Sequence, residues 1–422
     1  MKKAFNLTVL VAGLGYFVDM FDLTIFGVVR INSLKAILPN ASPEQILSTS
    51  VFLINMLAVG MLLGGLLWGV LGDKKGRLSV LFGSIILYSV ANLLNAFATN
   101  IPTYALLRFL AGVGLAGELG AAVTLVSESL APEIRGYGTT MIAALGLLGS
   151  VAASLSGQYL DWQTAYIIGG LMGLVLLFAR FSMVDSSIFN KAKQNTHRGD
   201  LKLLFTGSRL KRYALCVLAG VPVYFTTGIL FTFSPELSKE AGLVGVTAGQ
   251  SLLWGMIGLT LGDVLCGLLS QFLKSRRRAI LISLAFGICL MLAFLFGVGT
   301  NTKLFYIACF FLGLTCGYWA VLITLTAEQF GTNLRSTAAT SVPNLIRSAV
   351  IPLNFSFLFL RGHFGSQTSA FILSAVVYSI AMFSIYILSE SFGKSLDFIE
   401  EAEAKSVEQS DALLTENELS FE

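Results

Sequence analysis

Charged residues are scarce in this chain. Only 12% of its 422 residues are Asp, Glu, Lys or Arg, whereas 55% are hydrophobic. A soluble globular protein carries about twice that charged fraction. Proline is also rare, at 8 residues, while glycine is abundant at 42. This composition excludes an ordinary soluble domain and predicts a polytopic membrane protein with closely packed helices.

The residues and motifs of several kinds of chemistry are also missing. The two histidines, His197 and His363, lie far apart, and the five cysteines are scattered through apolar segments, so no metal site is expected. The sequence has no Gly-x4-Gly-Lys-Ser/Thr phosphate loop and no catalytic triad. We therefore expect a protein that is not an enzyme, uses no cofactor or direct ATP drive, and binds no nucleic acid.

Long apolar runs dominate what is present. Runs able to cross about 30 Å of hydrocarbon occur near 6–29, 49–71, 78–98, 103–127, 137–158 and 162–182. After a polar stretch, six more follow near 213–235, 247–273, 279–298, 303–327, 337–360 and 368–389. The predicted fold is an all-α membrane protein of twelve transmembrane helices. Its parts are a six-helix half at 1–182, a basic linker at 183–212, a second six-helix half at 213–389 and an acidic tail at 390–422.

Basic residues gather in alternate loops. Outside the linker, the connections expected on the N-terminal side of the membrane carry Lys74, Lys75, Arg77, Arg135, Lys274, Arg276, Arg277, Arg278 and Arg335. The positive-inside rule places these loops, and with them both termini, in the cytoplasm. The tail holds ten acids against two bases, which predicts a solvated segment. The expected location is the plasma membrane, the inner membrane in a bacterium.

An internal repeat relates the two halves. "SESLAPEIRG" at 127–136 and "AEQFGTNLRS" at 327–336 share a Glu-x6-Arg spacing at an offset of 200 residues. "GVLGDKKGR" at 69–77 is echoed by "GLLSQFLKSRRR" at 267–278 at almost the same offset. Two related halves are typical of a transporter with its site between them, near the bilayer midplane.

The same segments resemble the major facilitator superfamily. "GVLGDKKGR" is similar to the signature between helices 2 and 3 of that family, and "RFLAGVGLAGE" at 108–118 resembles its helix 4 signature. "SESFGKSLDFIE" at 389–400 is similar to a segment after helix 12 of sugar-porter-like members, with Ser389 in place of proline. The resemblance implies a monomeric transporter in two pseudo-symmetric halves that works by alternating access.

Two stretches narrow the branch. "DMFDLTIFG" at 19–27 and the segment 107–136 resemble the metabolite:proton symporters, and related groups that carry aromatic acids and sugars share parts of both. The glutamines expected on helix 7 of a sugar carrier are missing from "AGVPVYFTTGILFTFSPEL". The resemblance therefore implies a proton-coupled carrier and counts against hexoses.

A few ionisable residues lie deep inside predicted spans. Each costs a few kcal/mol or more against lipid, so each is expected to face a partner or a water-filled cavity. Asp19 and Asp22 lie on neighbouring faces of one helical turn near mid-depth, where a carboxyl group can load and release a proton. One of them could instead form a helix-packing hydrogen bond. We assign proton coupling to both, and substrate contact to Asp22.

Three further intramembrane charges are candidates. Arg347 lies about 15 Å from the cytoplasmic end of its span, and its planar fork suits a carboxylate. It could hold an anionic substrate, pair with an acid of the other half, or pair with Asp263. Glu118 is a candidate coupling acid, and Arg108 resembles an arginine linked to proton coupling in the superfamily. Each of these could instead tie its helix to a neighbour.

Six charged residues form a different class, at cytoplasmic span ends: Asp73, Arg77, Glu128, Arg135, Glu328 and Arg335. The family resemblance implies that they are gate ion pairs closing the inner side; inert surface pairs are the alternative. Tyr318 and Trp319 follow Gly317 in span 10 and are candidate substrate contacts, although aromatics are common in packing. The spacings Gly60/Gly64 and Gly65/Gly69 predict close helix contacts.

These observations predict a secondary active transporter for proton-coupled symport of a small carboxylate or zwitterion, such as a dicarboxylate, an amino acid or a betaine. Its partners would be that small polar or anionic metabolite, protons and the lipid bilayer. An exporter or antiporter of a drug or of an anionic metabolite such as a siderophore is an alternative. A transporter-like sensor that signals through its acidic tail is another.

Overall fold

The computed structural model of the chain describes residues 7–75, 77–118, 132–181, 204, 206–297, 301–331 and 334–393. Throughout these residues the regular backbone is helical. This is the expected solution for long apolar runs, because in hydrocarbon every backbone N–H and C=O must find its partner inside the segment.

The helices of the first half follow the predicted spans. They are α1 (Leu7–Ile37), α2 (Pro43–Lys75), α3 (Arg77–Asn95), α4 (Ile101–Leu115), α6 (Pro132–Tyr159) and α7 (Trp162–Phe181). The second half contains α9 (Gly207–Phe225), the π-helical turn η2 (Thr226–Phe231), α10 (Ser234–Glu240), α11 (Ala248–Phe272), α12 (Arg276–Gly297), α13 (Thr302–Cys316), α14 (Trp319–Gln329), α15 (Arg335–Ser348) and α16 (Val350–Ile387).

These helices account for the twelve predicted spans. Nine stretches of the described chain are long and apolar enough to cross a membrane, and two shorter apolar helices correspond to the third and fourth spans. The last long stretch, Thr337–Ile387, holds two spans, because the backbone turns back at Gly365 with φ of +77°. The left-handed region favours glycine at such a turn. The all-α, twelve-span prediction is confirmed.

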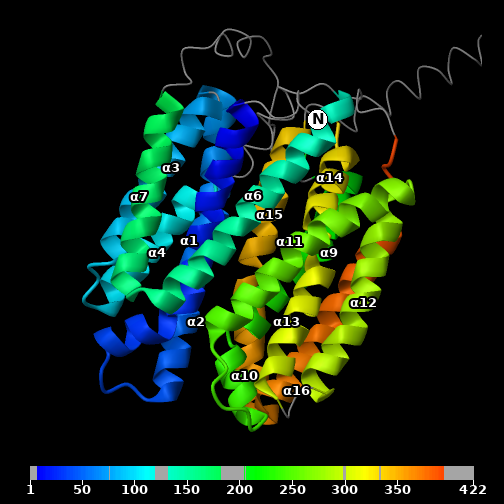
Figure 1. Cartoon of the computed structure of the whole chain (residues 1–422). Coiled ribbons are helices and arrows are strands. Elements are labelled where there is room, and N and C mark those ends of the chain that lie inside the picture. The colour runs from blue at the N-terminus through cyan, green and yellow to red at the C-terminus, as the bar shows by residue number, and fades with distance from the viewer. Residues whose placement is uncertain are drawn as a thin grey trace, which may run out of the picture.

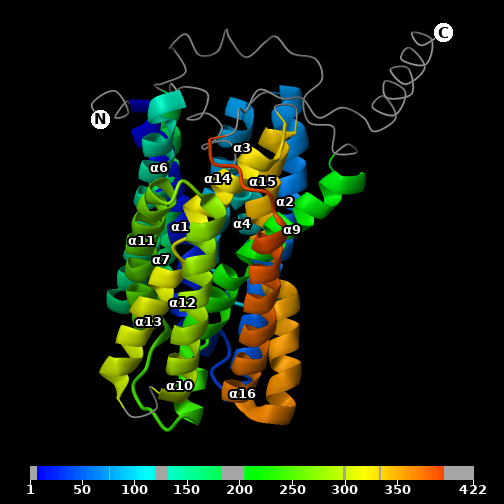
Figure 2. The ribbon, with the colours of Figure 1, turned by 90° about the vertical axis from the view of Figure 1, so that its right-hand side faces the viewer.

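The two halves stand side by side. In Figure 1 the blue-to-green helices of the first half lie on one side and the green-to-orange helices of the second on the other. Helix α6 of the first half packs along α11 of the second, and α2 packs along α15. The start of α1 and the end of α16 lie at the same end of the molecule (Figure 2), as an even number of spans requires.

Close glycine contacts repeat in the two halves. A Cβ at Gly60 of α2 would lie 2.1 Å from the carbonyl oxygen of Phe109 in α4. A Cβ at Gly258 of α11 would lie 2.0 Å from the carbonyl oxygen of Phe310 in α13. The backbones of each pair therefore approach as closely as two helices can. The prediction for Gly60/Gly64 is confirmed, and its counterpart in the second half, Gly258/Gly262, was not predicted.

Candidate functional site

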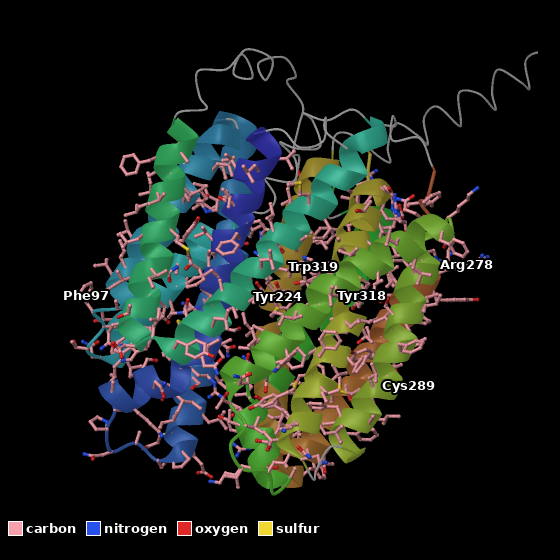
Figure 3. The ribbon with its side chains drawn as sticks, viewed as in Figure 1. Phe97, Tyr224, Arg278, Cys289, Tyr318 and Trp319 are labelled. Carbon is pink, nitrogen blue, oxygen red and sulfur yellow. The ribbon has the colours of Figure 1, made fainter. Side chains whose placement is uncertain are left out.

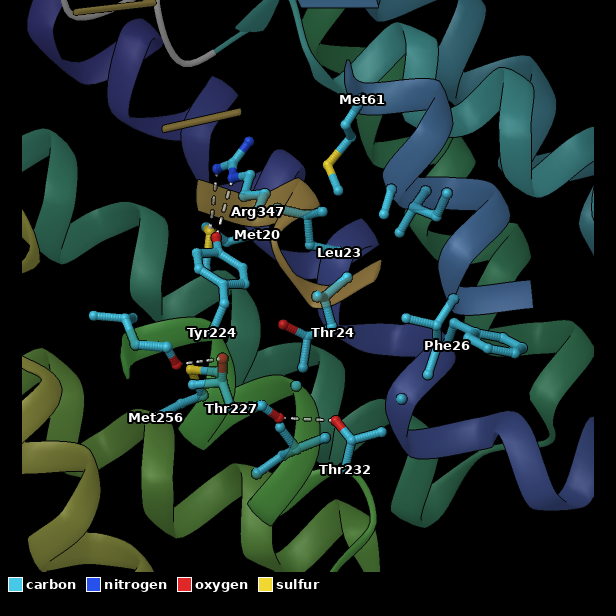
Figure 4. A pocket seen from close by; sticks show the side chains of 18 of the residues that line it. Met20, Leu23, Thr24, Phe26, Met61, Tyr224, Thr227, Thr232, Met256 and Arg347 are labelled. Carbon is cyan, nitrogen blue, oxygen red and sulfur yellow. Dashed lines mark hydrogen bonds between the residues drawn. The ribbon is translucent and has the colours of Figure 1, made fainter. Parts of the chain in front are cut away.

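A cavity of about 120 Å³ lies between the two halves. One water needs roughly 10–15 Å³ on this measure, so the space admits a small organic molecule. Most of the wall is apolar, and Figure 4 shows Met20, Met61, Met256 and Phe26 around it. The polar members of the wall are Tyr16, Thr24, Arg108, Tyr224, Thr227, Thr232 and Arg347.

Arg347 brings a positive charge to this apolar wall. It lies on α15, and its side chain is completely buried. One Nη2–H donates to Oδ2 of Asp19 on α1 at 3.1 Å. The Nε–H donates to the hydroxyl of Tyr224 at 3.0 Å (Figure 4). Its Nη1 has no hydrogen-bond partner among the described residues. The sequence allowed Arg347 to pair with an acid of the other half or with Asp263. The structure shows the first of these, with Asp19 as the acid.

Trp319 and Tyr318 have different positions. The Trp319 ring lines the cavity and meets the Tyr224 ring edge to face, with centroids 5.7 Å apart. The adjacent Tyr318 is buried away from the cavity wall, and its hydroxyl donates to the carbonyl of Ala219 at 3.0 Å. In Figure 3 the labels of Tyr224, Tyr318 and Trp319 lie near one another at mid-height of the molecule. Aromatic residues that are adjacent in sequence thus have different neighbours.

Asp22 belongs to a polar cluster inside the first half. Its carboxyl group is 1% exposed and has Asn92 of α3 and Arg108 of α4 as its polar neighbours. The Arg108 guanidinium sits over the Phe26 ring, 4.9 Å from its centroid, and also reaches the cavity wall. A Cβ at Gly169 of α7 would lie 2.6 Å from Asp22 Oδ1, so this glycine makes room for the carboxyl group.

Glu118 is fully buried just after the end of α4. It lies within electrostatic range of Asp19, on the same side of the interface between the halves. The structure therefore places Asp19 and Glu118 together, with Arg347 as the cation next to Asp19. Asp22 and Arg108 form the neighbouring cluster. Of the residues assigned to substrate contact from the sequence, Asp22 and Tyr318 are not among the described residues that line the cavity.

Asp263 has a partner that the sequence did not indicate. This residue of α11 does not pair with Arg347; its Oδ1 accepts the amide N–H of Ala320, at 2.9 Å, in the first turn of α14. A break at residues 317–318 separates α13 from α14 and leaves the amide N–H groups of the first turn of α14 free to bond with Asp263. Gly317 was the available signal in the sequence, but a glycine alone does not distinguish a helix break from a close contact.

The predicted cytoplasmic gate is described only in part. Glu328 accepts a hydrogen bond from the Ser391 hydroxyl at 2.6 Å and lies 3.4 Å from an Arg276 Nη2 in a salt bridge. Arg276 belongs to the second half, and Ser391 lies at the start of the tail. Glu128 lies outside the described residues, as do the side chains of Asp73, Arg77, Arg135 and Arg335. The gate assignment stays a prediction.

An ion pair that the sequence did not indicate lies at the opposite end of the molecule. Arg30 of α1 is fully buried and donates to Glu236 Oε2 at 2.8 Å and to the carbonyl of Thr232 at 2.8 Å. Its guanidinium also lies 4.8 Å from the centroid of the Phe233 ring. All these partners belong to the second half. The signal was a base at the outer end of span 1 and an acid just after span 7.

Comparison with known proteins gives the family. Residues 12–353 match the sequence model of the Major Facilitator Superfamily. The chain belongs to this superfamily. As a member it is a multi-pass membrane transporter of small metabolites and not an enzyme, and the resemblance noted in the signature segments is confirmed.

Individual relatives share moderate identity. The niacin transporter NiaP of Acinetobacter baylyi is 24% identical over 94% of this chain and 96% of its own length. The 3-(3-hydroxy-phenyl)propionate transporter of Escherichia coli is 29% identical over 66% of this chain and 69% of its own. An inward-open structure of the xylose transporter XylE from E. coli superposes with a TM-score of 0.70, at 16% identity, over 92% and 97% of the two chains. That last likeness shows the fold alone.

Proposed function

We propose that this superfamily member imports a small carboxylate together with a proton, and that its substrates are aromatic monocarboxylates. The observation that carries the proposal is Arg347, a buried guanidinium on an otherwise largely apolar cavity wall, with one Nη free of hydrogen bonds to the described residues. A guanidinium fork binds a carboxylate through two parallel hydrogen bonds, which orients the ligand as well as holding it.

The rest of the wall suits an aromatic body. Trp319, Tyr224 and Phe26 offer ring faces and edges, and the methionines adapt their shape to an irregular ligand. The relatives named for niacin and for 3-(3-hydroxyphenyl)propionate carry ligands of this class by name. These compounds fit the wall better than a betaine or an amino acid, because none of the described wall residues is an acid that could pair with a substrate cation.

A sugar fits this wall poorly. The three wall threonines already use their hydroxyl protons inside the protein. Thr24 donates to Ser150, Thr227 to the carbonyl of Val223, and Thr232 to the carbonyl of Thr227. These threonines can still accept a hydrogen bond but have no proton left to donate to a sugar oxygen, and a buried polar group left without a partner costs about 1–3 kcal/mol. The likeness to a xylose transporter is therefore taken as a likeness of fold.

Coupling follows from competition for Arg347. A substrate carboxylate that binds the guanidinium takes the place of Asp19, which lies 3.1 Å from the same group. Two buried carboxylates beside one guanidinium are costly, so the charge balance favours uptake of one proton by the Asp19 and Asp22 carboxyl groups. Release of substrate restores the Asp19–Arg347 pair and returns the proton. Glu118 and Arg108 adjust the charge around this exchange.

The orientation proposed from the sequence fits the same scheme. The end of the molecule at which α1 starts and α16 ends (Figure 2) also holds the start of α12, because Glu390, just after α16, accepts hydrogen bonds from the amides of Arg276 and Arg277. With Arg278 these bases assign that end to the cytoplasmic side of the plasma membrane. The protein is proposed to act as a monomer, because one chain supplies both halves of the cavity.

The test uses purified protein in liposomes with a pH-sensitive dye trapped inside. Nicotinate and nicotinamide have nearly the same shape and differ in the carboxylate, so we expect internal acidification with nicotinate and none with nicotinamide. Succinate, glycine betaine and xylose complete the panel. Succinate is informative because Arg108, also on the wall, offers a second cation for a dicarboxylate.

Three variants complete the experiment. Arg347→Lys keeps the charge but loses the fork, and is expected to raise KM by about 10- to 100-fold. Arg278→Lys, at an exposed position, is the matched control and should behave as wild type. Asp22→Asn should abolish proton entry. Uptake of nicotinamide or xylose at the rate of nicotinate would refute the proposal. Silence across the panel, with efflux of substrates loaded inside, would favour the exporter; binding without flux would favour the sensor.

A further inference from the structure

The tenth membrane span is interrupted at the level of the cavity. Helix α13 ends at Cys316, α14 begins at Trp319, and residues 317 and 318 lie between them. A Cβ at Gly317 would lie 2.2 Å from the carbonyl carbon of Gly262 in α11. The break is therefore pressed directly against the α11 backbone, with no space for a side chain between the two.

A helix start inside a membrane leaves amide groups without partners. The N–H groups in the first turn of a helix have no carbonyl one turn earlier to accept their hydrogen bonds. Hydrocarbon contains no water that could accept them instead. Here the carboxylate of Asp263, one residue after Gly262, accepts the N–H of Ala320 at 2.9 Å, and the N–H of Trp319 is directed to the same carboxylate. Asp263 thus caps α14 from a neighbouring helix.

The residue at the start of this capped turn is part of the cavity wall. Trp319 meets Tyr224 edge to face, and the Tyr224 hydroxyl accepts a hydrogen bond from Arg347. A chain of direct contacts thus runs from Asp263 through the first turn of α14 to the guanidinium. Asp263 is 3% exposed and is not among the residues that line the cavity, so its effect on a ligand is indirect, and Trp319 is the wall residue that it contacts.

Among the described residues no cation forms an ion pair with Asp263, and its Oδ2 has no hydrogen-bond partner there. A buried carboxyl group in this position costs free energy, and the two amides of α14 are the compensation that the structure provides. Deleting the cap therefore removes the interaction that holds the start of α14 in place.

We propose that Asp263 is a positioning residue of the binding site, which holds the start of α14 so that Trp319 closes the cavity against Tyr224. Its expected effect is on substrate affinity and not on turnover. The effect on affinity rests on the function proposed above, whereas the effect on the position of Trp319 does not. The two are therefore measured separately.

The first measurement follows Trp319 without any substrate. The protein, which has four tryptophans, is labelled with 5-fluorotryptophan and examined by fluorine NMR. The resonance of Trp319 is identified as the one missing from the spectrum of Trp319→Phe. Asp263→Ala should shift or broaden the Trp319 resonance, whereas Asp263→Asn, whose side-chain oxygen can still accept the amide protons, should leave it near the wild-type position. Trp162, in the first half, is the internal control.

The second measurement is nicotinate uptake in liposomes. Asp263→Ala is expected to raise KM by about five- to tenfold with a maximal rate within about twofold of wild type, and Asp263→Asn should restore KM. An unmoved Trp319 resonance in Asp263→Ala would overturn the proposal. So would an Asn variant as impaired as the Ala variant, because the charge and not the cap would then matter. Absence of uptake in the wild type would refute the proposed function and leave the resonance test standing.

Discussion

At the scale of single residues, three buried arginines show how a membrane span can hold a guanidinium. Arg30 and Arg347 each pair with a carboxylate, while Arg108 sits over the Phe26 ring beside Asp22. An unpaired guanidinium in lipid is costly, so its partners are part of the same structural unit. Arg108 and Arg347 both line the cavity and have guanidinium nitrogens without a hydrogen-bond partner among the described residues, which is the combination a substrate carboxylate requires. Arg347 differs in that its guanidinium already holds a carboxylate, that of Asp19, which a substrate can replace.

One residue-scale prediction concerns Gly169. An alanine there would place its Cβ 2.6 Å from Asp22 Oδ1 and 3.0 Å from the Phe21 ring. Overpacking of this kind costs about 1–3 kcal/mol and would displace the Asp22 carboxyl group. We expect Gly169→Ala to reduce the number of protons that enter with each nicotinate severalfold, measured as internal acidification per nicotinate transported.

The control for this variant is Gly267→Ala on α11, where the added methyl group would meet nothing within 4 Å. It should transport as wild type. Equal behaviour of the two alanine variants would show that the position of Asp22 does not limit coupling.

At the scale of the elements, interruptions of helices mark the cavity. The π-helical turn η2 follows Pro222 and contributes Thr227 to the wall, and the break after Cys316 contributes Trp319. Such interruptions are frequent at functional sites, because they free backbone groups and bend a span. In both spans the segment beyond the interruption is held by a charged residue of another helix, Arg30 at Thr232 and Asp263 at Ala320.

The end of α16 is tied to the start of α12 in a similar way. Glu390 accepts hydrogen bonds from the Ser275 hydroxyl and from the amides of Arg276 and Arg277. Partial burial alone would raise the pKa of this carboxyl group. The hydrogen bonds from Ser275 and from nearby backbone amides outweigh that effect, so the pKa lies below its ordinary value.

A prediction about pH follows for this connection. Because the pKa of Glu390 is lower in the folded protein than in the unfolded chain, its contribution to stability is present above about pH 4.5. That contribution is lost as the pH falls through the folded-state pKa. Glu390→Gln should lower the melting temperature in detergent by about 1–3 °C at pH 7, and the difference should shrink below pH 4.5.

Glu44→Gln, at an exposed glutamate in the first turn of α2, serves as the comparison and should change the melting temperature less. A difference for Glu390→Gln that stayed constant down to pH 3 would contradict the assigned role of the carboxylate.

At the scale of the whole molecule, contacts between the halves surround the cavity. Asp19–Arg347 joins them beside it, Asn55 accepts a hydrogen bond from Asn354 at 2.9 Å, and Arg30–Glu236 joins their outer ends. Alternating access requires that contacts on one side of the site break when the halves rock. Of the two ion pairs in this group, Asp19–Arg347 lies beside the cavity and Arg30–Glu236 lies at the predicted outer end.

We therefore expect Glu236→Gln to favour opening of the outer side. The variant leaves Arg30 buried without its anionic partner, which destabilises the closed arrangement. In a background with the native cysteines replaced, Thr24→Cys on the cavity wall should react with an external, membrane-impermeant maleimide at least about threefold faster when Glu236 is Gln.

The matched control lies on the same short helix. Glu240 of α10 pairs with Arg361 of its own half, at 3.5 Å, so Glu240→Gln should not change the labelling rate. Equal acceleration by both variants would show that loss of charge from α10, and not loss of the contact between the halves, is responsible.

Much of the architecture follows from the sequence alone. Span number, the two related halves and the buried charges Asp19, Asp22, Arg108, Glu118 and Arg347 were predicted, because the length of an apolar run and the cost of a charge within it are local properties. The buried position of each of these five side chains in the structure agrees with that argument.

The tertiary structure alone decided which charges meet. Asp19, and not Asp263, pairs with Arg347, although 328 positions separate the two partners. Tyr318 turns away from the cavity that Trp319 lines, and Arg30 finds Glu236 across the interface. Such pairings depend on the rotation of each helix and on the packing of one half against the other. Contacts between distant segments set both, and no local stretch of sequence encodes them.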